Sequence, residues 1–172
     1  MAESFVEYAE RIRGYLGGKD PLQSMQETGS ALPSLLQNIP EAIATRRPSA
    51  DKWSISEIVA HLSDTELAAG FRFRAIAGGD DGVPLAGYDQ NRWAEAANYR
   101  ASKLQESVRS FLAIREMNLR FLKGLPESAW SKYGIHSERG RETLGELVEL
   151  VAGHDLNHIA QIKRILGSAQ AA

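Results

Sequence analysis

Signals that start helices are spread along the whole chain, and they constrain its fold more than any other sequence feature. In a capping box, a Ser or Thr side chain caps the first turn while a Glu or Gln three residues later bonds back to it. This spacing occurs at Ser54–Glu57, Ser102–Gln105 and Thr143–Glu146. Asp20 followed by Pro21 is a fourth start, because proline at the first helical position loses no hydrogen bond. Ser4–Glu7 is a weaker fifth start.

Glycines mark where these helices should end. They are Gly14, Gly17, Gly18, Gly78, Gly79, Gly124 and Gly167. We therefore expect a short N-terminal helix and then four longer helices near residues 21–38, 55–77, 103–123 and 144–166, with Pro33 kinking or splitting the first of the four. The sequence contains no run of alternating β-branched residues as clear as these helix signals, so it predicts no strands. The predicted fold is all-α, a four-helix bundle whose topology the connecting segments do not fix.

Composition excludes several classes of protein. A chain of 172 residues is about one domain, which we divide into an N-terminal helical extension, 1–19, and a bundle, 20–167. With 20 basic and 22 acidic residues, the net charge is −2, so no basic surplus indicates nucleic acid or an anionic membrane as a partner. The absence of cysteine excludes disulfides and Cys-containing metal sites. No signal peptide or membrane-length apolar segment is visible, and we expect a cytoplasmic protein.

Histidines occupy positions where a plain core would have apolar residues. His154 and His158 are four residues apart, so they share one face of the expected last helix. That face is the inward stripe Leu147, Val151, His154, His158, Ile162 and Ile165. His61 lies beside the apolar stripe of the 55–77 helix. A buried imidazole without a partner costs roughly 1–3 kcal/mol, and one metal ion would satisfy all three while leaving a coordination position open.

Other readings of these residues stay open. A pair of histidines at this spacing also occurs by chance, as core residues with other partners or as a surface pair. We interpret His136 as a loop residue and not as a ligand. Asp64, three residues after His61, could act as a catalytic base or orient a ligand, and it could equally be solvated.

Three further sets of residues suggest supporting roles. Glu66 and Arg115 fall on the inward stripes of their helices, and we hypothesise a structural ion pair between them. Asp155 faces a different neighbour from His154, which favours either a hydrogen bond that orients a metal ligand or a hydrogen bond between helices. Tyr88 and Trp93, in the long segment 79–98, could wall a pocket or simply pack.

Two segments of the chain resemble the DinB/YfiT-like superfamily. They are residues 52–66, which contain His-Leu-Ser-Asp-Thr-Glu, and residues 153–162, which contain His-Asp-Leu-Asn-His-Ile-Ala-Gln-Ile. Gly140 with Thr143-Leu144 also fits, and the resemblance spans about residues 20–167. It implies a four-helix bundle that holds a divalent metal, zinc or nickel, through His61, His154 and His158. It also implies a homodimer.

The resemblance implies two kinds of function. Characterised relatives include thiol-dependent transferases and isomerases that use bacillithiol or mycothiol. We therefore expect a metalloenzyme acting on a small molecule, either a thiol-dependent S-transferase or a small-molecule hydrolase. The alternative is a non-catalytic binding or dimerisation module that the metal only stabilises. That alternative is favoured by the lack of an unambiguous acid, base or nucleophile beyond the three histidines.

Overall fold

A computed structural model describes residues 3–170 of the chain, with side chains described up to Ser168. Seven helices and three short strands form in the described part. They are α1 (Phe5–Gly14), α2 (Pro21–Leu36), α3 (Glu41–Ala44), α4 (Ile55–Gly78), β1 (Val83–Leu85), α5 (Gln90–Ala96), α6 (Leu104–Lys123), β2 (Tyr133–His136), β3 (Gly140–Thr143) and α7 (Leu144–Gln170). The predicted all-α four-helix bundle with a short N-terminal helix is confirmed. Within the described residues, no helix has the length and apolar composition needed to cross a membrane.

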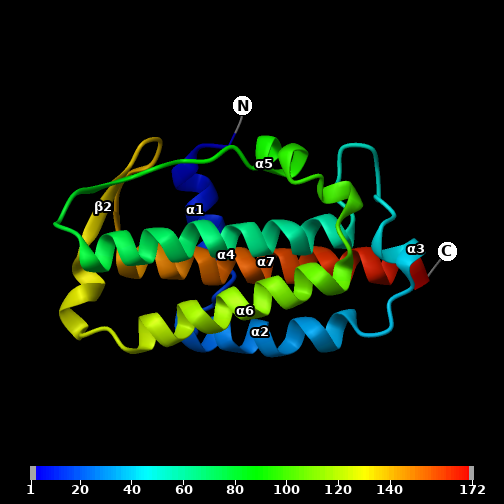
Figure 1. Cartoon of the computed structure of the whole chain (residues 1–172), viewed down its shortest axis with the longest axis horizontal. Coiled ribbons are helices and arrows are strands. Elements are labelled where there is room, and N and C mark those ends of the chain that lie inside the picture. The colour runs from blue at the N-terminus through cyan, green and yellow to red at the C-terminus, as the bar shows by residue number, and fades with distance from the viewer. Residues whose placement is uncertain (1–2, 171–172) are drawn as a thin grey trace.

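The four long helices α2, α4, α6 and α7 lie side by side along the length of the molecule (Figure 1). Helix α4 packs against α6 and α7, and α2 packs against the same two helices. The colour gradient in Figure 1 shows that α4 and α6 run in the same direction, opposite to α2 and α7. Because α4 and α6 are parallel neighbours, residues 79–103 must return along the bundle before α6 begins, and this return segment carries α5.

Helix α1 crosses the bundle at a steep angle and packs against α7 (Figure 1). The contact is close because α7 presents a glycine there: a Cβ atom on Gly153 would lie 2.2 Å from the carbonyl oxygen of Ile12. Ile12 is fully buried in this contact. The N-terminal helix is thereby fixed over the middle of α7.

Capping chemistry explains most of the helix starts. The capping boxes at Ser4 and Ser54 are present, and Thr143 Oγ1 accepts a hydrogen bond from the backbone N–H of Glu146 while the Glu146 carboxylate bonds back. The predicted box at Ser102 is wrong. Lys103 is the N-cap of α6 and makes no side-chain capping bond.

Two predicted helix ends are also wrong. Helix α2 is not split at Pro33, although the proline has no backbone N–H to donate to the carbonyl of Gly29. Helix α7 continues past Gly167 to Gln170. Gly167 does not adopt the positive φ with which glycine ends a helix.

The small sheet corrects the prediction that there are no strands. Strand β1 pairs in parallel with β2, which pairs antiparallel with β3. Strands of three or four residues are too short to show alternation, and they contain Pro84 and Gly134. Gly134 is needed because a Cβ atom there would lie 2.6 Å from the side chain of Leu85. The sheet caps one end of the bundle, and β3 leads directly into α7.

The buried apolar residues that the structure describes form three clusters, a small one between α1 and α7 and two larger ones among the four long helices, where a buried polar layer lies between them. Phe73 and Leu147 belong to the cluster nearer the sheet, and Ile58 and Phe111 belong to the other. Arg115 lies between them and is 2% exposed.

Arg115 makes contacts with all three of the other long helices. Its Nη2 donates to Glu66 Oε1 on α4 at 2.7 Å and to Asp155 Oδ2 on α7 at 2.5 Å, and its Nη1 donates to the Met25 carbonyl on α2 at 2.8 Å. Burial alone would lower the pKa of Arg115, but the two carboxylates raise it, so the guanidinium stays charged. The hypothesised Glu66–Arg115 pair and the inter-helix role of Asp155 are both confirmed.

We predict that Arg115→Met at pH 8 lowers the free energy of unfolding by about 3–5 kcal/mol, because two buried carboxylates lose their shared cation. Urea denaturation followed by circular dichroism measures the change. Arg109→Met on the exposed face of the same helix is the matched control and should change stability by less than about 0.5 kcal/mol. Equal effects of the two substitutions would show that the cluster does not stabilise the bundle.

Candidate metal centre

The structure brings His61 of α4 together with His154 and His158 of α7. The Nε2 atom of His154 lies 3.1 Å from Nε2 of His61 and 3.1 Å from Nε2 of His158. The three are the only group of metal-ligating side chains found among the described residues that offers three atoms within 4.8 Å of one another. Each ring therefore turns the same nitrogen toward a common centre.

The hydrogen bonding of His158 leaves its Nε2 as an electron-pair donor. Nδ1 of His158 lies 2.9 Å from Gln161 Oε1, which can only accept, so the proton of His158 is on Nδ1 and its Nε2 is free to bind a cation. Nδ1 of His61 and of His154 are buried without a partner in the described structure. Ligands about 2.0–2.1 Å from a tetrahedral metal are about 3.3 Å apart. The observed spacing of 3.1 Å fits a single metal ion.

Burial keeps the three rings neutral. It lowers the pKa of His61 to about 3 and that of His158 to about 4, and it lowers the pKa of His154 well below the ordinary value. Neutral imidazole is the form that binds metal. The group is thus in its ligating form at neutral pH without any proton having to leave.

Side chains around His61 hold it in place. The Trp53 ring lies 4.9 Å from the His61 ring, between centroids. The Thr65 hydroxyl, one turn further along α4, is 3.5 Å from His61 Nε2 and 3.3 Å from the Tyr88 hydroxyl. Trp93 stacks on Tyr88 with centroids 4.4 Å apart. Tyr88 thus lies beside His61, whereas Trp93 packs against the ring of Tyr88.

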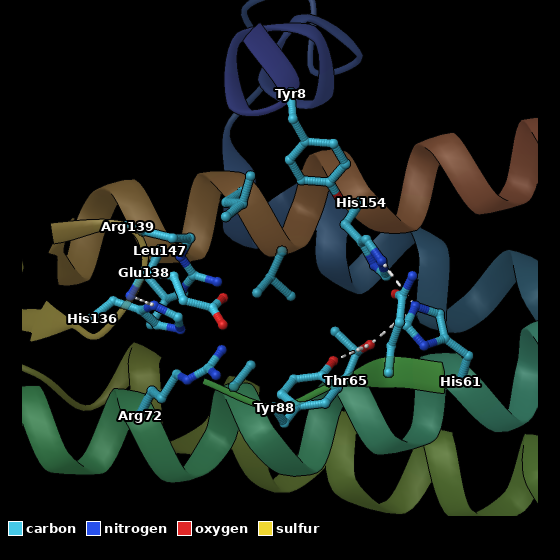
Figure 2. A pocket seen from close by; sticks show the side chains of 14 residues that line it. Tyr8, His61, Thr65, Arg72, Tyr88, His136, Glu138, Arg139, Leu147 and His154 are labelled. Atoms are coloured by element: carbon cyan, nitrogen blue, oxygen red, sulfur yellow. Dashed lines mark hydrogen bonds between the residues drawn. The ribbon is translucent and has the colours of Figure 1, made fainter. Parts of the chain in front are cut away.

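A cavity of about 180 Å³ opens beside the histidines. It lies between α4 and α7, and Figure 2 shows Tyr8 pointing into it from α1 and Tyr88 from the return segment. Leu147 and Val151 of α7 and Ala69 of α4 give it an apolar wall. The volume is below the usual range for drug-sized ligands, so the cavity fits a small molecule.

Asp64 does not join the three histidines. Its Oδ2 accepts a hydrogen bond of 2.6 Å from the Tyr99 hydroxyl, and burial, together with this bond, raises the pKa of Tyr99. Asp64 lines a different surface hollow, away from the cavity. Its catalytic role stays a prediction, and the contact with Tyr99 favours a structural one.

His136 lies on β2 and is 3% exposed, so its interpretation as a loop residue is wrong. It lines the far end of the cavity and is not part of the three-histidine group. Sequence reasoning also missed Arg72 and Tyr8, which line the cavity. Arg72 follows Ala69 by three residues on the inward stripe of α4, which could have indicated it. No signal in the sequence shows that α1 would bring Tyr8 there.

Comparison with known proteins identifies the family. Residues 24–162 match the model of the DinB superfamily, and the chain belongs to this superfamily. The resemblance found in the sequence is therefore confirmed.

Two curated relatives carry a functional name. The protein named "Putative metal-dependent hydrolase OB0782" of Oceanobacillus iheyensis is 25% identical over 110 residues, which are 64% of this chain and 63% of that protein. The protein named "Putative metal-dependent hydrolase BH0277" of Halalkalibacterium halodurans is 21% identical over 137 residues, 80% of this chain and 79% of that protein. The chain thus matches somewhat less than two thirds of the first relative.

A solved structure has the same fold. YfiT from Bacillus subtilis, described as a probable metal-dependent hydrolase with an unusual four-helix bundle topology, matches with a TM-score of 0.76 at 17% identity. The match covers 86% of each chain. At this identity, the likeness supports the fold of the bundle.

We predict that the metal-free protein loses stability as the pH falls from about 6.5 to 4. Unfolded histidines have an ordinary pKa near 6.5, whereas His158 in the folded chain has a pKa of about 4. The unfolded state therefore binds more protons than the folded state in this window. The free energy of unfolding decreases as the pH decreases. Urea titrations at pH 7, 6 and 5 measure the slope.

His158→Gln should flatten this slope relative to the unmodified chain. The comparison separates the histidine from carboxylates that titrate nearby, such as Asp155, whose pKa burial raises to about 7. Equal slopes for the two chains would mean that the pKa of His158 in the folded chain is not lowered.

Proposed function

We propose that the protein is a metal-dependent hydrolase of a small molecule, in which His61, His154 and His158 hold one divalent cation, zinc or nickel. The observation that supports it best is the convergence of three Nε2 atoms at one end of a small cavity. Imidazole ligands suit both metals. The names of the relatives, metal-dependent hydrolases, agree with this choice.

The residues of the chain would have distinct roles around such a cation. Bound by three neutral ligands, the cation keeps its full charge and supplies Lewis-acid chemistry, lowering the pKa of a water or polarising a substrate carbonyl. The hydroxyls of Thr65 and Tyr88 lie beside His61 and can orient a substrate by hydrogen bonding. Leu147 and Val151 would pack against the apolar part of the substrate.

The remaining expectations belong to this proposal. Thiol-dependent S-transfer would use the same three histidines, with a thiol in place of water. A non-catalytic module would have the metal without turnover. A small-molecule substrate, a homodimer and a cytoplasmic location stay predictions from the sequence, as does the absence of nucleic-acid and membrane partners.

We predict that His61→Ala, His154→Ala and His158→Ala each reduce bound metal to below about one tenth of an equivalent, because two imidazoles retain a cation poorly. The measurement is elemental analysis after purification without a nickel column and reconstitution with zinc. His136→Ala, which removes a histidine outside the group, should keep full occupancy. Full occupancy in two of the three site variants would overturn the ligand assignment.

Activity of the zinc-loaded protein separates the candidate functions. Hydrolysis of small esters or amides that chelation abolishes and that needs no thiol would support the proposal, with folded His158→Ala as the inactive control. Turnover only in the presence of a low-molecular-weight thiol would overturn hydrolysis in favour of transfer. A chelator that lowers the melting temperature of a protein with no turnover under either condition would indicate the non-catalytic module.

A further inference from the structure

The end of the cavity farthest from the histidines contains a buried arginine without an acidic partner. Arg72 is 7% exposed, and its Nη2 donates to the Ala86 carbonyl at 2.6 Å. Among the described residues, no carboxylate oxygen lies within 4.0 Å of its guanidinium nitrogens. The Tyr88 ring packs 5.5 Å from the guanidinium carbon and fixes its position. Figure 2 shows the Arg72 side chain pointing into the cavity.

Two further donors lie at the same end, both on the β2–β3 hairpin. Nδ1 of His136 accepts from the backbone N–H of Glu138 at 3.2 Å, so the imidazole proton is on Nε2. That Nε2 is buried and has no partner in the described structure. Arg139 is held by Glu142 at 2.6 Å, and its Nε is buried and unpartnered too. A buried donor without an acceptor is unfavourable, so these groups indicate a missing acceptor.

Two carboxylates affect the net charge at the Arg72 end of the cavity. Glu142 is 4% exposed and neutralises Arg139. Glu138 is exposed at the hairpin turn and forms no ion pair within 4.0 Å, yet Figure 2 shows its carboxylate pointing toward Arg72 and Arg139. Its position shows that a carboxylate fits at this end of the cavity. Being exposed and unpaired, Glu138 can be displaced by a ligand, whereas Glu142 cannot.

We propose that Arg72, assisted by His136 and Arg139, forms a subsite for the carboxylate of the substrate, whose reacting group lies at the three histidines. This inference rests on the proposed function, since the histidine end defines where the reaction would occur. The Cα atoms of His61 and Arg72 are about 16 Å apart along α4, at 1.5 Å per residue, and both side chains extend into the space between them.

The part of the cavity between the three histidines and Arg72 limits which substrates fit. Ala69, Leu147 and Val151 line it with apolar side chains. A suitable substrate is therefore a short aliphatic chain with a carboxylate at one end and an ester or amide bond at the other. Guanidinium binds carboxylate in two parallel hydrogen bonds, which fixes orientation as well as charge.

Binding of butyrate to the zinc-loaded protein, measured by calorimetry, tests the subsite without reference to activity. Arg72→Gln should weaken binding about tenfold or more, the order expected for loss of a charge-assisted hydrogen bond. Glu138→Gln should strengthen binding severalfold, because it removes the competing carboxylate. The matched control Arg109→Gln, on the exposed face of α6, should have no effect. Arg72→Lys, which keeps the charge but not the fork, should lie in between and serves if Arg72→Gln fails to fold.

Hydrolysis of two esters of equal length separates this inference from the proposed function. Monomethyl glutarate carries a carboxylate and methyl pentanoate does not. Arg72→Gln should raise KM for the first about tenfold or more and leave the second unchanged.

Zinc-dependent hydrolysis of both esters with equal effects of Arg72→Gln would overturn the carboxylate subsite and leave the hydrolase intact. Failure to hydrolyse either ester, with butyrate binding that still depends on Arg72, would overturn the hydrolase and leave the subsite. Butyrate binding that neither Arg72→Gln nor Glu138→Gln alters would overturn the subsite directly.

Discussion

The buried guanidinium of Arg115 is the interaction on which the geometry of the site depends. It ties α6 to Glu66 on α4, to Asp155 on α7 and to the backbone of α2. Asp155 directly follows His154, so fixing this carboxylate also fixes the axial position of α7 relative to α4. Buried charges are expensive when they lack partners, and any sliding of the helices would separate them. The register that aligns the histidines is therefore enforced by an ion cluster that lies outside the three-histidine group.

Most of the bundle could be predicted because its signals are local. The capping boxes at Ser54 and Thr143 set where α4 and α7 begin, and helical periodicity placed His154 and His158 on one inward face. The approach of His61 needed only that two inward faces meet in a core. The wrong predictions concern local features too: Gly167 lacks a positive φ and stays within α7, and the strands are too short to show a period.

Part of the cavity lining could not be predicted from the sequence, because it comes from segments distant in the chain. Tyr8 arrives on α1, Tyr88 on the return segment and His136 on a strand, whereas Arg72 lies on a helix that the sequence defined well. Each of these placements depends on tertiary contacts, such as the approach of α1 to Gly153. Asp64 illustrates the converse: proximity to His61 in sequence suggested chemistry, but the helix turns its carboxylate toward Tyr99.

The parallel arrangement of α4 and α6 has a consequence beyond packing. Adjacent helices that alternate in direction can be joined by a tight turn, leaving the groove beside them open. Here residues 79–103 must run back along the bundle before α6 can begin (Figure 1). This return segment contributes Tyr88 and Gln90 to the lining of the cavity. Access to the cavity thus depends on how the chain connects α4 to α6. Changes within the return segment can alter which molecules enter without disturbing the four long helices.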